Sequence, residues 1–221
     1  MLLALDTATR MTGIALHDGA RVLAEHVWQG GRHQTVELAP QVALLLQRRG
    51  LVPSDLLAVA VASGPGSYTG LRIGMALAKG LVLEHNLPLV GIPTLDILAQ
   101  AQPNQQLPMA ALIQAGRGRL AAGWYKLRKG NWRAKGEVET LTWPEMLERL
   151  KEPVYVCGEL TAEQREILRQ EKPVTLAPPS LCIRRPSVLA DMAWERVRNG
   201  KTSKPERLAP TYLDTPSGKS R

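Results

Sequence analysis

The chain holds little that would support a membrane, redox or base-stacking function. It has 221 residues, no phenylalanine, 4% aromatic residues and only two cysteines, Cys157 and Cys182. We interpret both cysteines as reduced core residues, because they lie in apolar surroundings and are too few to hold a metal alone. No apolar run approaches the ~20 residues of a transmembrane helix, and Asp6 interrupts the first run too early for a secretory signal. We therefore expect a cytoplasmic protein without membrane contact.

Basic residues outnumber acidic residues only in the second half of the chain. Residues 1–103 carry seven Lys/Arg and seven Asp/Glu, whereas residues 104–221 carry 21 and 13 and account for the whole net charge of +8. A basic half suits a polyanion such as RNA. It would equally serve as a solvated surface that keeps the protein soluble, and the scattered tryptophans form no base-stacking platform.

What the chain does contain is a glycine-rich loop between a strand and a helix. Residues 57–62 are apolar without alternation, which is typical of a strand buried on both faces. The loop follows directly, and its residues are Gly64, Pro65, Gly66, Ser67, Tyr68 and Thr69. Glycine permits positive φ and close backbone approach, so the loop is expected to hold either an anion or another stretch of backbone.

The helix expected after this loop, roughly residues 71–85, repeats small residues every four positions. One line contains Gly70, Gly74 and Ala78, and another contains Ala76 and Gly80. Each interior glycine costs about 0.8–1 kcal/mol relative to alanine, and close helix packing would offset that cost. The helix is apolar nearly all round, so it either packs only within its own core or also docks on a partner.

Residues 64–74, followed by Ala78, Lys79 and Gly80, resemble the signature of the bacterial TsaB (YeaZ) family. That family is the non-catalytic partner in threonylcarbamoyladenosine (t6A) modification of transfer RNA. The resemblance implies an α/β, actin-like ATPase fold of the Hsp70 and sugar-kinase superfamily, with two lobes that are each a mixed sheet flanked by helices. It also implies a heterodimer with a TsaD-like catalytic subunit, recruitment of a TsaE-like ATPase, tRNA contact through the complex, and a homodimer when the chain is alone.

In TsaB-like proteins, the glycine-bearing helix and the one before it pair with two helices of the partner. Here the earlier helix is expected over residues 34–49, with Pro40 causing a kink or a later start. The partner interface that the resemblance implies comprises His33, Val36, Ala39, Gly70, Leu71, Ile73, Gly74, Leu77, Ala78 and Leu81.

Asp6, Thr7 and Thr9 occupy the turn that holds phosphate in the actin-like superfamily, but Ala8 stands where glycine is usual. Its Cβ restricts the approach of a phosphate to the backbone. Phosphate chemistry also requires a metal and further carboxylates, and the first hundred residues show no second acidic motif. We interpret the turn as vestigial, with Asp6 capping turn amides, and expect no catalytic residue and no cofactor.

The sequence also offers no convincing set of metal ligands. The two metal-binding histidines of the related catalytic subunit would fall at Thr94, a possible helix N-cap, and Leu98, neither of which supplies an imidazole. His33 and Glu37 are four residues apart but are only two ligands of mixed type. We expect no metal. At the first turn of the second half, Gln114 and Arg119 replace the carboxylates usual in the family, so that the local charge is basic.

The polar, proline-flanked stretch 102–108 predicts the boundary between two lobes. The N-terminal lobe, residues 1–103, would carry the partner-binding helices. The smaller C-terminal lobe, residues 104–221, would include a final helix near residues 186–198 and a flexible tail. Two alternatives to a scaffold remain open: an ATP-dependent small-molecule kinase or ATPase that depends on Asp6, and a protease using Ser63 or Ser67, for which no His/Asp pair is apparent.

Overall fold

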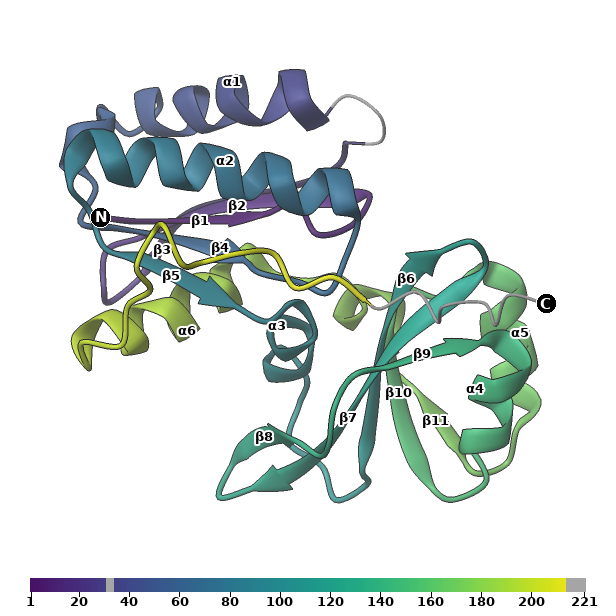
Figure 1. The fold of residues 1–221 in the computed structure, drawn as a ribbon. Helices are drawn as coiled ribbons and strands as arrows, with labels where there is room; N and C mark the ends of the chain where they lie inside the picture. The colour runs from purple at the N-terminus through teal and green to yellow at the C-terminus, as the bar shows by residue number, and fades with distance from the viewer. Residues whose placement is uncertain (31–33, 214–221) are drawn as a thin grey trace.

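The structure, a computed structural model, describes residues 1–30 and 34–213 as two β-sheets with helices packed on them (Figure 1). The first sheet has the strand order β3-β2-β1-β4-β5. Its strands β1 and β2 are antiparallel, whereas β4 runs parallel to both β1 and β5. The strands are β1 (Leu2–Asp6), β2 (Met11–His17), β3 (Val22–Gln29), β4 (Ala58–Ala62) and β5 (Leu89–Ile92).

Both faces of the first sheet are covered by helices, which explains why β1 and β4 are apolar throughout. Alternate residues of a strand point to opposite faces. Leu3 and Leu5 enter the core under α1 (Gln34–Gln47) and α2 (Tyr68–His85). Leu2 and Ala4 enter the core under α6 (Pro186–Arg198) on the other face.

The second sheet follows α3 (Thr94–Gln100) and has the order β11-β10-β6-β7-β8, with β9 also paired to β7. Its strands are β6 (Met109–Gly116), β7 (Arg119–Arg128), β8 (Asn131–Ala134), β9 (Glu139–Thr142), β10 (Val154–Gly158) and β11 (Val174–Leu176). The helices α4 (Trp143–Arg149) and α5 (Ala162–Gln170) accompany it, and short 3₁₀ turns span Pro53–Asp55 and Pro179–Leu181. The predicted α/β fold, two mixed sheets flanked by helices, is confirmed.

Several details differ from the sequence predictions. The final helix α6 follows the second sheet in the chain, and it packs on β1 and β2 of the first sheet. Thr94 is the first residue of α3 rather than its N-cap, which is Pro93. Pro40 lies inside α1 instead of delaying its start. The lobe boundary near residue 103 stays a prediction, and the expected flexible tail beyond residue 213 lies outside the described residues.

The segment after α6 returns across the first sheet toward the glycine loop (Figure 1, yellow). Ser203 forms a bridge with Leu89, and the Thr211 amide donates to the Ser63 carbonyl at 2.7 Å.

Both cysteines are free, and Cys157 is fully buried. Within residues 1–30 and 34–213, none of the helices combines the length and hydropathy needed to cross a lipid bilayer.

Candidate functional site

The line of small residues that begins at Gly70 faces the chain's own first hairpin. A Cβ at Gly70 would lie 2.1 Å from the Thr7 carbonyl oxygen, and one at Gly74 would lie 2.3 Å from the Thr7 hydroxyl. That hydroxyl donates to the Gly70 carbonyl at 2.6 Å. Close packing therefore does offset the helix cost of these glycines, but the contact is internal.

This packing corrects the expected partner interface. Gly70, Leu71, Gly74 and Ala78 are buried against the chain's own residues and offer little surface to a partner. The other expected positions on described residues remain accessible: Val36 and Ala39 are exposed, and Ile73, Leu77 and Leu81 are half-buried. His33, together with its possible role beside Glu37, lies outside the described residues.

The second line of small residues, Ala76 and Gly80, is the one that faces outward. Both residues are exposed, and a Cβ at Gly80 would meet no atom within 4 Å. Around them, Val36 is 69% and Leu83 70% exposed, and Leu44 and Tyr68 are exposed as well. The four-residue spacing of Ala76 and Gly80 is the sequence pattern that indicates this face. The sequence alone does not show which of the two lines of small residues faces outward, because that depends on how α2 packs in the structure.

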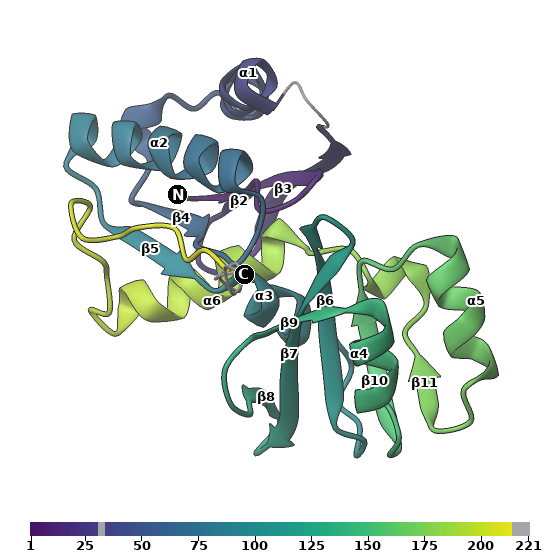
Figure 2. The same cartoon turned by 45° about the vertical axis from the view of Figure 1, so that its right-hand side comes forward.

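A groove of about 510 Å³ separates the outer edges of α1 and α2. Figure 2 shows the two helices side by side over the first sheet, away from the second sheet. The groove is mostly apolar, with Arg72 at its end, and its lining residues are Thr35, Leu38, Ala39, Tyr68, Thr69, Arg72, Ile73, Ala76 and Leu77. Among the described residues of α1, Glu37 is the one charged side chain, and it accepts a hydrogen bond from the Trp28 indole at 3.0 Å. This helix pair can therefore pack against apolar side chains of another protein.

The glycine loop holds backbone, the second of its two expected uses. The Ser67 amide donates to the Ala8 carbonyl at 2.6 Å, and a Cβ at Gly66 would lie 2.2 Å from that same oxygen. Gly64, with φ of +109°, approaches the Thr211 carbonyl equally closely. Two other segments of the chain thus pack against the loop, while Gly66, Ser67 and Tyr68 also line the cleft described below.

The exposed end of the loop carries a cluster of Tyr68, Arg72 and Tyr212. The Arg72 guanidinium lies 3.9 Å from the Tyr68 ring centroid, and its Nε donates to the Tyr212 hydroxyl at 2.9 Å. Hydrogen bonding to Tyr212 raises the pKa of Arg72. The returning C-terminal segment is thereby attached to the first turns of α2, beside the groove.

The turn of Asp6, Thr7 and Thr9, which the sequence analysis interpreted as vestigial, is closed by an arginine that the sequence reasoning missed. Asp6 is 2% exposed, and its Oδ1 accepts from the Ala8 amide at 2.9 Å, so that it caps the turn. Its Oδ2 accepts from Nε of Arg184 at 2.8 Å, and Arg184 also donates to the Thr9 hydroxyl at 2.9 Å. No local motif around Arg184 signals this role, because its partners are far away in the sequence.

Glu159, which follows β10 and is partly exposed, completes a network with the buried Asp6 and Arg184. Its Oε1 accepts from Arg184 and from the Thr9 hydroxyl. Burial would lower the pKa of Arg184, but the two carboxylates outweigh it and raise that pKa above its ordinary value. Since Arg184 donates to both oxygens of the Asp6 carboxylate, a magnesium ion would have to displace the guanidinium to bind there.

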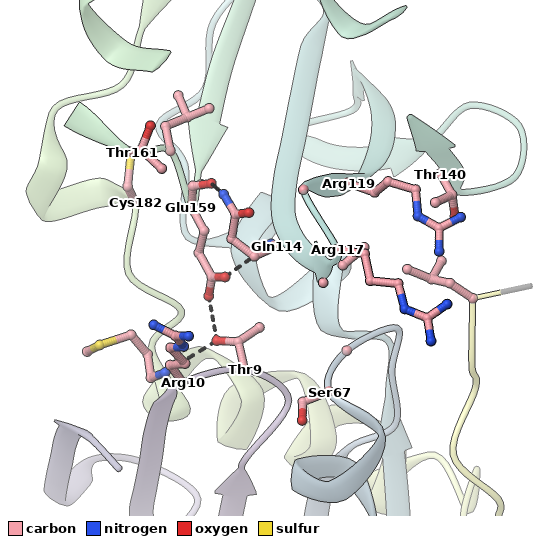
Figure 3. A pocket seen from close by; sticks show the side chains of 18 of the residues that line it. Thr9, Arg10, Ser67, Gln114, Arg117, Arg119, Thr140, Glu159, Thr161 and Cys182 are labelled. Carbon is pink, nitrogen blue, oxygen red and sulfur yellow. Dashed lines mark hydrogen bonds between the residues drawn. The ribbon is translucent and has the colours of Figure 1, made fainter. Parts of the chain in front are cut away.

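A cleft of about 1200 Å³ lies between the two sheets, in front of this network (Figure 3). Figure 3 shows Arg117 and Arg119 projecting into it from the β6–β7 turn, with Glu159 on the opposite wall. Gln114 donates from Nε2 to the Glu159 carbonyl at 2.9 Å, a bond that an aspartate at that position could not make. The family's acidic pair is thus replaced by a donor to Glu159 and by a basic rim.

The positions that correspond to metal-binding histidines in the related subunit are buried. Thr94 and Leu98 are both 0% exposed, and the Thr94 hydroxyl accepts from the Gly64 amide at 3.1 Å. Among residues 1–30 and 34–213, no three His, Cys, Asp or Glu side chains gather in a way that could hold a metal ion.

Ser67 acts as the N-cap of α2, where its hydroxyl accepts from the Gly70 amide at 3.2 Å.

Comparisons with known proteins relate the chain to the t6A machinery. A family model described as "TsaD: tRNA N6-adenosine threonylcarbamoyltransferase" matches residues 22–184. The tRNA threonylcarbamoyladenosine biosynthesis protein TsaB of Bacillus subtilis is 32% identical over 76% of this chain and 74% of its own length. The protein of the same name from Escherichia coli is 30% identical over 96% of this chain and 94% of its own.

A solved structure has the same overall arrangement. YeaZ from Pseudomonas aeruginosa superposes with a TM-score of 0.76 at 28% identity, over 96% of this chain and 99% of that one. At this coverage both sheets belong to the shared fold.

Proposed function

The chain belongs to the TsaB (YeaZ) family, and from that membership we propose that it is a non-catalytic scaffold for t6A modification of tRNA. It binds a TsaD-like catalytic subunit, holds that subunit in its working form in the cytoplasm, and helps to recruit a TsaE-like ATPase. The transfer of the threonylcarbamoyl group to adenosine 37 is the work of the partner.

The observation that carries this proposal is the outward apolar face of α1 and α2. We call it the docking face and define it by Val36, Ala39, Ile73, Ala76, Leu77, Gly80, Leu81 and Leu83. Small residues at its centre let a partner helix approach closely, and the larger apolar residues around them supply buried area. Because the chain matches the TsaD family model, equivalent helices of a TsaD-like partner would meet it as a four-helix bundle.

The closed phosphate turn favours a scaffold over a kinase or ATPase. A phosphoryl-transfer site must place a metal ion beside a carboxylate and beside the transferred phosphate. Here Asp6 is bonded to Arg184, and both hydroxyls of the turn are engaged within the chain. A homodimer of the lone chain would use the same docking face, since two identical apolar faces can pair isologously.

The test is reconstitution of the modification from purified components. The chain alone, supplied with tRNA and a threonylcarbamoyl donor, is expected to form no t6A, whereas its cognate TsaD-like protein is expected to require the chain for full activity. Transfer by the chain alone would disprove the scaffold. Steady ATP turnover by the chain alone would instead favour the kinase or ATPase alternative.

A further inference from the structure

One charged surface lies outside both the docking face and the cleft. Residues 126–135 run from the end of β7 through β8 and contain five Lys/Arg and no Asp/Glu. All five basic side chains are exposed. We call them the basic patch: Lys126, Arg128, Lys129, Arg133 and Lys135.

The hairpin register concentrates these charges on one face. Lys126 stands directly opposite Arg133, and Arg128 lies two residues along on the same side. The intervening Leu127 pairs with Trp132, and both turn to the opposite face and join the core. Like charges directly opposite each other in an antiparallel pair are destabilising. The free chain therefore tolerates a local repulsion that an anion on this face would relieve.

The neighbouring carboxylates do not neutralise the patch. Glu139 is engaged by Arg149 and by the Trp124 indole, at 2.8 and 2.9 Å. In the part of the chain that the structure describes, none of the five basic side chains takes part in an ion pair shorter than 4.0 Å. The nearest carboxylate along the sequence, Glu137, is itself exposed.

The hairpin is held rigidly, so that the charges keep their arrangement. Trp132 is 2% exposed, and its carbonyl accepts from the Gln100 side chain at 2.7 Å. Its indole donates to the Gln102 carbonyl. Figures 1 and 2 both place β8 at the end of the molecule opposite α1 and α2, so a partner on the docking face leaves the patch free.

We propose that the basic patch binds the phosphate backbone of RNA. This rests on the proposed function, in which the complex acts on tRNA, and it adds a direct contact from this subunit. Five cations on a rigid hairpin match a regularly spaced chain of phosphates, and such contacts need no aromatic platform. A membrane surface is less well matched, because residues 126–135 present no exposed large apolar side chain that could insert.

The test compares two double charge reversals with the same change in net charge. Lys126→Glu with Arg133→Glu alters the patch, and Lys172→Glu with Lys201→Glu alters exposed lysines elsewhere. Binding of a tRNA transcript is measured over a range of salt, for each chain alone and for each complex with the TsaD-like protein. The patch variant is expected to bind at least ~10-fold more weakly and to lower the slope of log K against log salt by about 2. The control is expected to change far less.

Equal losses in both variants, or no loss in the patch variant, would overturn the proposal. Lys126→Gln with Arg133→Gln, checked by circular dichroism, covers the case in which the charge reversal does not fold. Vesicles containing phosphatidylserine serve as a second probe, and patch-dependent binding to vesicles but not to tRNA would also overturn it. Complex formation is weighed in the same samples. If no complex forms, the proposed function fails. The tRNA binding of the chain alone then still tests whether the basic patch contacts RNA.

Discussion

Arg184 and Asp6, 178 positions apart in the sequence, form a buried ion pair in which Nε lies 2.8 Å from Oδ2. The pair joins the turn after β1 to the segment before α6, and Glu159 extends it to the end of β10. The network ties the two sheets together at the point where the cleft begins.

Replacing Arg184 with methionine should strongly destabilise the protein. The substitution leaves the buried Asp6 and the partly buried Glu159 without their cation, and breaking a buried pair in this way costs about 3–5 kcal/mol. The free energy of unfolding, measured with urea, should fall by that amount. As a matched control, Arg198→Met removes an exposed i,i+3 partner of Glu195 and should change stability by less than about 1 kcal/mol. A loss from Arg184→Met as small as the control's would contradict the structural role of the network.

Two glycines of α2 should respond oppositely to alanine. Gly80→Ala adds a Cβ in open space and should raise the free energy of unfolding by about 0.8–1 kcal/mol through helix propensity alone. Gly74→Ala has the same propensity gain, but its Cβ would lie 2.3 Å from the Thr7 hydroxyl, so stability should fall. Denaturant unfolding of both variants checks this, and a gain at Gly74 would show that the contact with Thr7 is loose.

Glu25 should contribute stability that disappears in acid. Its carboxylate accepts from the amide and hydroxyl of Ser187 and pairs with Arg185. Burial raises the pKa of Glu25, but these bonds outweigh it and hold the pKa below its ordinary value of 4.5. A depressed folded-state pKa gives stability that is complete above the unfolded pKa and is lost as pH falls through the folded pKa.

The comparison with Glu25→Gln isolates this effect. The difference in unfolding free energy between wild type and variant should be constant well above pH 4.5 and should shrink as the pH falls below it. Unfolding curves at a series of pH values measure the difference directly. A difference that instead grows in acid would mean that the pKa is raised in the folded state.

The sequence predicted the fold well where local patterns determine structure. The apolar run before the glycine loop became β4, and the helices expected after that loop and near residues 186–198 became α2 and α6. Strand β11 carries no such local pattern. Its three residues, Val174–Leu176, are too few to show a period.

The candidate site was only partly predictable, because its geometry depends on contacts between distant segments. Four-residue spacing revealed two lines of small residues on α2, but spacing alone does not say which line faces the core. The line that begins at Gly70 faces the core, because the Thr7 hydroxyl packs there and donates a hydrogen bond to the Gly70 carbonyl. The roles of Arg184 and Glu159 were likewise invisible, since buried charges reveal their partners only in three dimensions.

The burial of Gly74 and Ala78 changes which substitutions test the docking face. Glutamate at either position would place a charge inside the core and should prevent folding rather than leave a folded monomer. Glutamate at the exposed Ala76 should leave the chain folded, because its side chain can reach solvent. Ala162→Glu, at an exposed position in the first turn of α5, is the matched control.

The most direct measurement is the mass of the complex formed when the chain is mixed with its cognate TsaD-like protein, determined by sedimentation. Wild type and Ala162→Glu should form a one-to-one complex, whereas Ala76→Glu should sediment separately from the TsaD-like protein while keeping the circular dichroism of the wild type. An intact complex with folded Ala76→Glu would contradict docking through α1 and α2.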